Sequence, residues 1–210
     1  MTQESTSKVK MKVSKKRIFA ILIVLAVPVV AFLFVTYFPW PIKSWSYQGM
    51  PVSFRADLRS AQKIPILTSL SNAQDPDSIV RNALVRDDVT NITFLFKPTS
   101  DQGNALYIVE RYEIIKALTF AYLYSPTTEL HQIPTFDTQA VDSYSNITAT
   151  QFNLKIVLVH PDFGNDTVVS NDGYIVYVEA KNMSSFDSEK TQFDLATVRL
   201  MMAILSIKIQ

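Results

Sequence analysis

The sequence predicts a membrane-anchored protein whose folded domain is of the α/β or α+β class: one N-terminal transmembrane helix, then a mixed β-sheet domain with about three helices. Three observations lead to this prediction. An uncharged apolar run lies near the start of the chain, several later segments are apolar on both sides, and longer segments between them carry apolar residues at three- and four-residue steps. Two-sided strands that alternate with such helices build a sheet covered by helices.

The apolar run covers residues 18–38 and contains no charged side chain. At about 1.5 Å rise per residue, its length matches a hydrocarbon core of ~30 Å. Residues 1–17 carry six basic side chains against one acidic side chain, and basic segments stay on the cytoplasmic side of a membrane. We therefore expect a cytoplasmic tail at 1–17, a transmembrane helix at 18–38 and a domain outside the cell membrane.

A cleaved signal peptide is the alternative interpretation of this run. Signal peptides have an apolar region of about 7–15 residues that ends in small side chains. The run in this chain is longer and ends in Tyr37 and Phe38. The sequence therefore favours an uncleaved, single-pass signal-anchor.

Aromatic side chains follow the apolar run, and three of them are candidates for the membrane interface: Trp40, Trp45 and Tyr47. Their amphipathic rings suit the headgroup region of a lipid bilayer. Two prolines at positions 39 and 41 end the helix and stiffen the exit. Residues 39–50 are therefore predicted to be a short spacer that holds the domain, residues 51–210, close to the outer leaflet.

The first elements of the domain follow from local patterns. Residues 52–59 alternate between apolar and polar side chains, which predicts a half-buried strand. Residues 64–67 form a short extended piece, and Pro65 places it at a sheet edge. Asp75 and Pro76 suit the cap and first position of a helix.

The middle of the domain is predicted to hold its central strand and longest helix. Residues 89–97 are apolar on both sides, which is typical of a strand covered on both faces. Residues 104–124 have the period of a helix. Residues 125–150 are polar and predict a long loop, which is either functional or mobile.

The last third of the chain predicts a two-sided strand, a hairpin and a buried helix. The strand covers residues 151–160, and the hairpin pairs 167–170 with 174–180 around an Asn-Asp-Gly turn. The final helix covers residues 191–207 and has little polar surface. Its apolar length is too short for a second membrane span.

Composition excludes several classes of function. The chain has no cysteine, which excludes thiolate metal sites, a thiol nucleophile and a lipoprotein anchor, and favours a prokaryotic source. After residue 17 the chain carries 14 basic and 18 acidic residues, so it lacks the basic surface that nucleic-acid binding requires. With four glycines and no phosphate-binding loop, nucleophile elbow or metalloprotease motif, we expect no cofactor, no metal and no catalytic residue.

Four sequons for N-glycosylation lie after the apolar run, at Asn91, Asn146, Asn165 and Asn182. Asn146 and Asn182 are the best candidates because they fall in predicted loops, whereas Asn91 begins the predicted central strand. Glycosylation is possible on the outer side of a membrane. The alternative is coincidence, because threonine is common in strands.

Arg55, Asp57 and Arg59 share the polar side of the first predicted strand. Such a row binds a carboxylate or phosphate, or it is a solvated and salt-bridged strand face. The two histidines, His131 and His160, lack the spacing of metal ligands.

Two stretches and the predicted anchor together resemble uncharacterised archaeal membrane proteins that have one span and one extracytoplasmic α/β-type domain. The first stretch is residues 54–59 followed shortly by 64–66, and the second is residues 194–200. The resemblance implies an archaeal cell-surface setting. It implies no activity and no site residue.

These observations favour a non-enzymatic interaction domain, with a membrane or cell-envelope protein as partner, as in an accessory subunit of a membrane complex. A solute-binding or sensing domain is the second hypothesis, in which residues 125–150 cover a crevice of the sheet. An enzyme is the third hypothesis, and it needs His131 or His160 beside a carboxylate in a cleft. The sequence does not predict the oligomeric state.

Overall fold

The structure is a computed structural model that describes residues 24, 26–30, 32–33, 40–69, 75–124 and 132–209. The chain divides into two compact units, Met1–Trp40 and Pro41–Gln210. In the first unit, the described residues between 24 and 33 are helical and exposed. Most of the predicted span at 18–38, and the whole basic tail, lie outside the described residues. Within the described ranges, no helix has the length and apolar character needed to cross a membrane.

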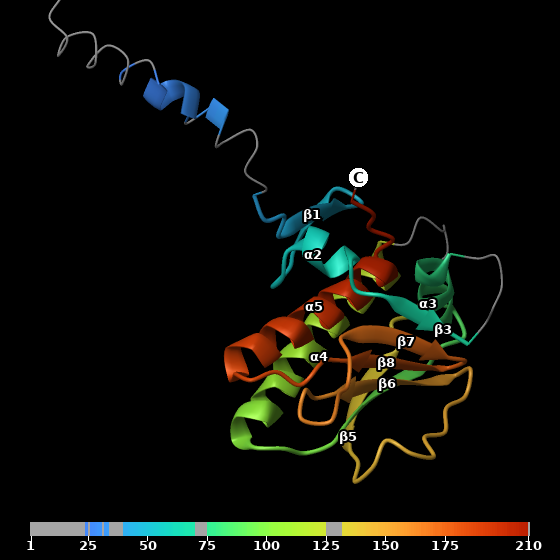
Figure 1. Ribbon diagram of the computed structural model, residues 1–210. Helices are drawn as coiled ribbons and strands as arrows, with labels where there is room; N and C mark the ends of the chain where they lie inside the picture. Colours follow the sequence, from blue (N-terminus) through green and yellow to red (C-terminus); the bar gives the residue numbers. More distant parts are fainter. Residues whose placement is uncertain are drawn as a thin grey trace, which may run out of the picture. The chain divides into compact units, whose positions relative to one another are not determined.

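The second unit contains a six-stranded mixed sheet in the order β3-β7-β8-β6-β4-β5 (Figure 1). Its strands are β3 (Ile66–Thr68), β4 (Asn91–Phe96), β5 (Thr135–Ala140), β6 (Asn153–Val159), β7 (Val168–Asp172) and β8 (Ile175–Glu179). β7 and β8 form an antiparallel hairpin, and all other neighbours run parallel. The predicted mixed sheet, its edge strand β3 and its hairpin are confirmed. The strand predicted to be central, β4, is an interior strand that lies next to the edge strand β5.

Helices pack on one face of this sheet and share a single core with it. They are α2 (Leu58–Gln62), α3 (Pro76–Leu84), α4 (Asp101–Leu123) and α5 (Phe186–Ile204). The apolar side chains of β4 and β6 that face them are wholly or almost wholly buried, among them Ile92, Phe94, Leu154 and Ile156. α4 and α5 lie side by side across the sheet (Figure 1). The described part of the domain therefore has one helix more than the expected three, the short α2.

The predicted strand at 52–59 is only partly a strand. β2 (Met50–Ser53) pairs with β1 (Ser44–Tyr47), and the backbone then leaves the extended conformation and enters α2. The reason is Asp57, whose carboxylate caps α2 by accepting from Ser60 N (3.1 Å) and also accepts from Ile42 N (2.7 Å). The alternation of burial persists although the backbone changes, with positions 52, 54, 56 and 58 all buried.

Residues 41–50, predicted as part of the spacer, belong to the compact unit as the β1–β2 hairpin. The turn places Gln48 and Gly49 at positive φ, 50° and 82°, and glycine adopts this conformation without steric cost. The turn directs Tyr47 into the core, where 8% of its surface is exposed. Trp40 and Trp45 are 54% and 38% exposed. They remain candidates for the membrane interface, whereas the buried Tyr47 does not.

The predicted loop at 125–150 contains the strand β5, which lies parallel to β4 at the edge of the sheet. Sequence patterns do not reveal β5 because only Phe136 among its six residues packs against the core. Residues 141–150, named here the covering segment, then cross the sheet face opposite the helices. Val141, Tyr144 and Ile147 from this segment pack on a small second core.

Candidate functional site

The sheet face opposite the helices is polar in one part and apolar in another. The apolar part is the second core, formed by Leu95, Val157 and Val159 beneath the covering segment. The polar part lies over β5, β4 and the first half of β6. It presents Asn91, Thr93, Asp137, Gln139, Asn153 and Lys155. Polar side chains at Thr93 and Lys155 are unusual, because interior strands such as β4 and β6 are normally apolar on both sides.

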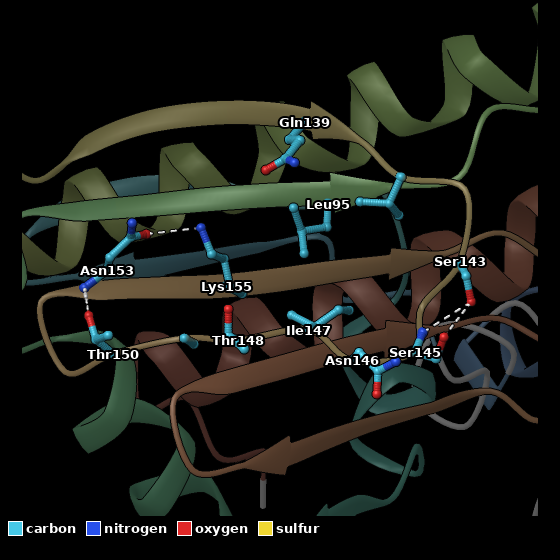
Figure 2. A pocket seen from close by; sticks show the side chains of 12 residues that line it. Leu95, Gln139, Ser143, Ser145, Asn146, Ile147, Thr148, Thr150, Asn153 and Lys155 are labelled. Atoms are coloured by element: carbon cyan, nitrogen blue, oxygen red, sulfur yellow. Dashed lines mark hydrogen bonds between the residues drawn. The ribbon is translucent and has the colours of Figure 1, made fainter.

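A groove of about 400 Å³ lies between the covering segment and this polar part (Figure 2). Gln139 of β5 borders one side, and Leu95, Asn153 and Lys155 form the floor. The other side is the covering segment. It contributes Val141, Ser143, Ser145, Asn146, Ile147, Thr148, Ala149 and Thr150.

Strand register brings the polar side chains of this sheet face together, including Lys155 and Asn153 of the floor. Thr93 of β4 lies opposite Lys155 of β6 on one side and opposite Asp137 of β5 on the other. The Lys155 ammonium donates to Thr93 Oγ1 (2.9 Å) and to Asn153 Oδ1 (3.2 Å). Asn91 Nδ2 donates to Asp137 Oδ2 (2.9 Å), and Asn91 Oδ1 is buried without a hydrogen-bond partner.

The Lys155 ammonium group in the groove is partly shielded from water. Burial lowers the pKa of Lys155, and the nearby Asp137 carboxylate opposes this shift. An ammonium group that has lost part of its water shell binds an anionic or strongly polar group more readily than a fully hydrated one. The groove therefore combines one cation with amide and hydroxyl groups that donate and accept.

The Tyr144 side chain makes several hydrogen bonds between the covering segment and the sheet. The Tyr144 hydroxyl donates to the carbonyl of Leu158 (2.9 Å) and accepts from the backbone N–H of Lys97 (3.1 Å). It also lies 3.3 Å from the hydroxyl of Tyr107. Tyr144 thus joins the carboxyl ends of β4 and β6 and positions the wall of the groove.

Two of the three predicted polar surface residues come together elsewhere. Arg55 and Asp57 border a hollow of about 450 Å³ beside α5, and Arg59 does not. The Arg55 guanidinium donates to Asp194 Oδ1 (2.8 Å), and Asp57 is occupied as the cap of α2. The row is split because the chain turns into α2 at Leu58.

The four sequons differ in exposure. Asn146, Asn165 and Asn182 are exposed, and Asn146 also borders the groove. Asn91 is engaged with Asp137 within β4. Modification at the three exposed positions stays a prediction.

His160 directly follows β6 and is 3% exposed. Its Nδ1 accepts from the backbone N–H of Asp162 (3.2 Å) and lies 3.3 Å from the Asp162 carboxylate. The rings of Tyr107 and Phe193 pack around it, and it borders none of the three hollows described for this chain. His131 lies outside the described residues. The histidine–carboxylate contact that the enzyme hypothesis needs is present, but His160 is buried, the Asp162 side chain is 48% exposed, and neither residue borders one of these hollows.

Sequence reasoning missed the groove residues Gln139, Asn153 and Lys155. A signal for them exists: Thr93 and Lys155 are polar positions inside otherwise apolar strands.

Comparison of the chain with protein-family models, with curated proteins and with solved structures finds no match.

Proposed function

We propose that this protein is a membrane-anchored ectodomain that binds a small polar solute in the groove beneath the covering segment. The observation that carries the proposal is the convergence of Lys155, Asn153 and Gln139 with the hydroxyls of the covering segment on one hollow of about 400 Å³. The apolar run at 18–38 and the basic tail before it support the anchor and the outward orientation.

The groove's chemistry favours a small organic acid or a hydroxylated solute. Lys155 supplies a positive charge for a carboxylate, and the amides of Asn153 and Gln139 each donate and accept hydrogen bonds. Leu95 and Ile147 offer apolar surface to a carbon skeleton. At about 30 Å³ per water-sized group, the hollow holds roughly a dozen non-hydrogen atoms.

The test uses the full chain in lipid nanodiscs and measures thermal unfolding with separate sets of sugars, hydroxy acids and amino acids. A solute that binds the folded state raises the midpoint in a concentration-dependent way. We expect Lys155→Met, and Thr148→Trp at the wall of the groove, to abolish the shift. The matched control is Lys181→Met, an exposed lysine outside the groove lining.

Two results would contradict the proposal. One is the absence of a shift with every solute set. The other is a solute whose effect is the same in wild type, Lys155→Met and Thr148→Trp.

The interaction domain expected from the sequence is a second candidate function, and an exposed apolar row on α4 favours it. Ile108, Tyr112 and Leu123 are 62%, 65% and 58% exposed and lie four and eleven positions apart, on one side of a helix. Such a row is typical of a surface that contacts a membrane or envelope protein. Crosslinking in native membranes should capture a partner that a Tyr112→Ser/Leu123→Ser double variant loses. Equal capture by both proteins would reject this surface.

A further inference from the structure

A second, apolar cavity of about 320 Å³ lies between α4 and the helix-facing side of the sheet. Its lining is mostly apolar and includes Phe94, Phe96, Ile108 and Leu158, and Arg111 also borders it. Arg111 is the one charged side chain in the lining, and no acidic residue belongs to it. The cavity is separate from the groove, because the two lie on opposite faces of the sheet and share no lining residue.

Most polar groups around this cavity already have partners. The side-chain amide of Asn104 accepts from Thr99 N (3.1 Å) and donates to Thr99 O (3.3 Å). The Thr138 hydroxyl accepts from Arg111 Nη1. The exception is Arg111 Nε, which is buried and has no hydrogen-bond partner.

An arginine that borders an apolar hollow and has no ion-pair partner within the described part of the chain points to an anionic acceptor. Buried donors are almost always paired in folded proteins, and the planar guanidinium matches a carboxylate with two parallel hydrogen bonds. No ion pair with Arg111 occurs among the described residues. The rest of the lining, rich in Phe and Leu, binds hydrocarbon and not further polar groups.

We propose that this cavity binds a free medium-chain carboxylic acid, with its carboxylate on Arg111 and its apolar body among Phe94, Phe96 and Leu158. At about 30 Å³ per water-sized group, the volume accommodates roughly ten non-hydrogen atoms. Octanoate has this size and serves as the probe. Ile108, which is 62% exposed, marks the accessible border of the cavity.

The experiment titrates octanoate, and its neutral analogue octanamide, into the full chain in nanodiscs by calorimetry, with protein-free nanodiscs subtracted. We expect one octanoate per chain. Arg111→Gln should weaken octanoate binding at least tenfold and change octanamide binding less than threefold. Ile108→Trp, which places a large side chain at the border, should abolish both. The matched control Arg86→Gln, an arginine paired with Asp88 away from the cavity, should bind as wild type does.

Equal octanoate affinity in wild type and Arg111→Gln would overturn the proposal, as would the absence of saturable heat above that of the nanodiscs. Circular dichroism establishes that each variant is folded, and Arg111→Lys, which keeps the charge without the planar fork, should bind with intermediate affinity. Lys155→Met should leave octanoate binding unchanged. Failure at this cavity is therefore distinguishable from failure at the polar groove.

Discussion

Replacing Glu110 should stabilise this domain, and more so as the pH rises. Glu110 lies on α4 where α4 meets α5, is fully buried, and neither of its carboxyl oxygens has a hydrogen-bond partner. Burial is the largest cause that raises the pKa of Glu110, and the neighbouring Asp194 carboxylate adds to it. Thr197 and Arg55 lower the pKa by less, so it stands well above its usual value.

The sign of the pH effect follows from this shift. The folded state holds a proton that the unfolded chain releases near its ordinary pKa of about 4.3. The contribution of protonated Glu110 to the free energy of unfolding is complete below that pH, and it is lost as the pH rises through the folded-state pKa. Each unit by which the pKa is raised corresponds to about 1.36 kcal/mol of unfolding free energy once the group is ionised.

Glu110→Met removes the ionisable group and keeps a similar volume. Replacing buried ionic groups by well-packed apolar side chains of similar volume is often neutral or stabilising by about 1–4 kcal/mol, so at about pH 8 we expect Glu110→Met to gain up to that amount. At about pH 5 the gain should be smaller, because the wild-type carboxyl is then protonated. Urea unfolding of the full chain in mild detergent, followed by circular dichroism at several pH values, measures both quantities.

Glu113→Gln is the matched control, because Glu113 lies on the same helix, is partly exposed and pairs with Lys116. It should keep the wild-type dependence of stability on pH. If Glu110→Met shows the same pH slope as wild type, or is less stable at every pH, the account of a protonated buried carboxyl is refuted.

Three further predictions concern the same unfolding measurement. Gly164→Ala should cost about 1–3 kcal/mol by overpacking, because its Cβ would lie 2.1 Å from the Ala180 carbonyl oxygen; unchanged stability would show that the loop yields freely. Tyr122→Phe should cost about 0.5–1.5 kcal/mol, because the Tyr122 hydroxyl donates to the Leu84 carbonyl at 2.7 Å; no loss would mean that water replaces this bond. Burial lowers the pKa of His160, so the free energy of unfolding should fall as the pH drops below about 6.5. In His160→Asn this fall should be smaller. If the variant loses stability at acid pH as steeply as wild type, other titrating groups cause the loss.

The sequence reveals those parts of the fold where packing and local pattern agree. β4 and β6 are recognisable because both of their faces are covered, and α5 because almost all of its later residues are buried. β5 is not recognisable, because an edge strand is held by backbone hydrogen bonds and needs little apolar surface. Residues 52–59 show the reverse case, in which burial alternates as predicted while the cap at Asp57 sets a different backbone.

The candidate site depends on information that a single strand does not carry. Lys155 and Thr93 are 62 positions apart and meet only through the parallel register of β4 and β6. The groove wall depends on Tyr144, whose hydroxyl finds partners after β4 and within β6. The row of Arg55, Asp57 and Arg59 is visible in the sequence, but the structure separates its members: Arg55 is in an ion pair, Asp57 caps α2, and Arg59 lies within α2.

Tyr144 has a consequence for the speed and strength of recognition. A segment that becomes ordered only upon binding subtracts its lost conformational entropy from the affinity, about 0.5–1.5 kcal/mol for each immobilised side chain. Here the hydroxyl of Tyr144 already holds the covering segment, so this entropy is lost when the chain folds. A solute would therefore meet a groove wall that is already held in place, and its association should need no ordering of this segment.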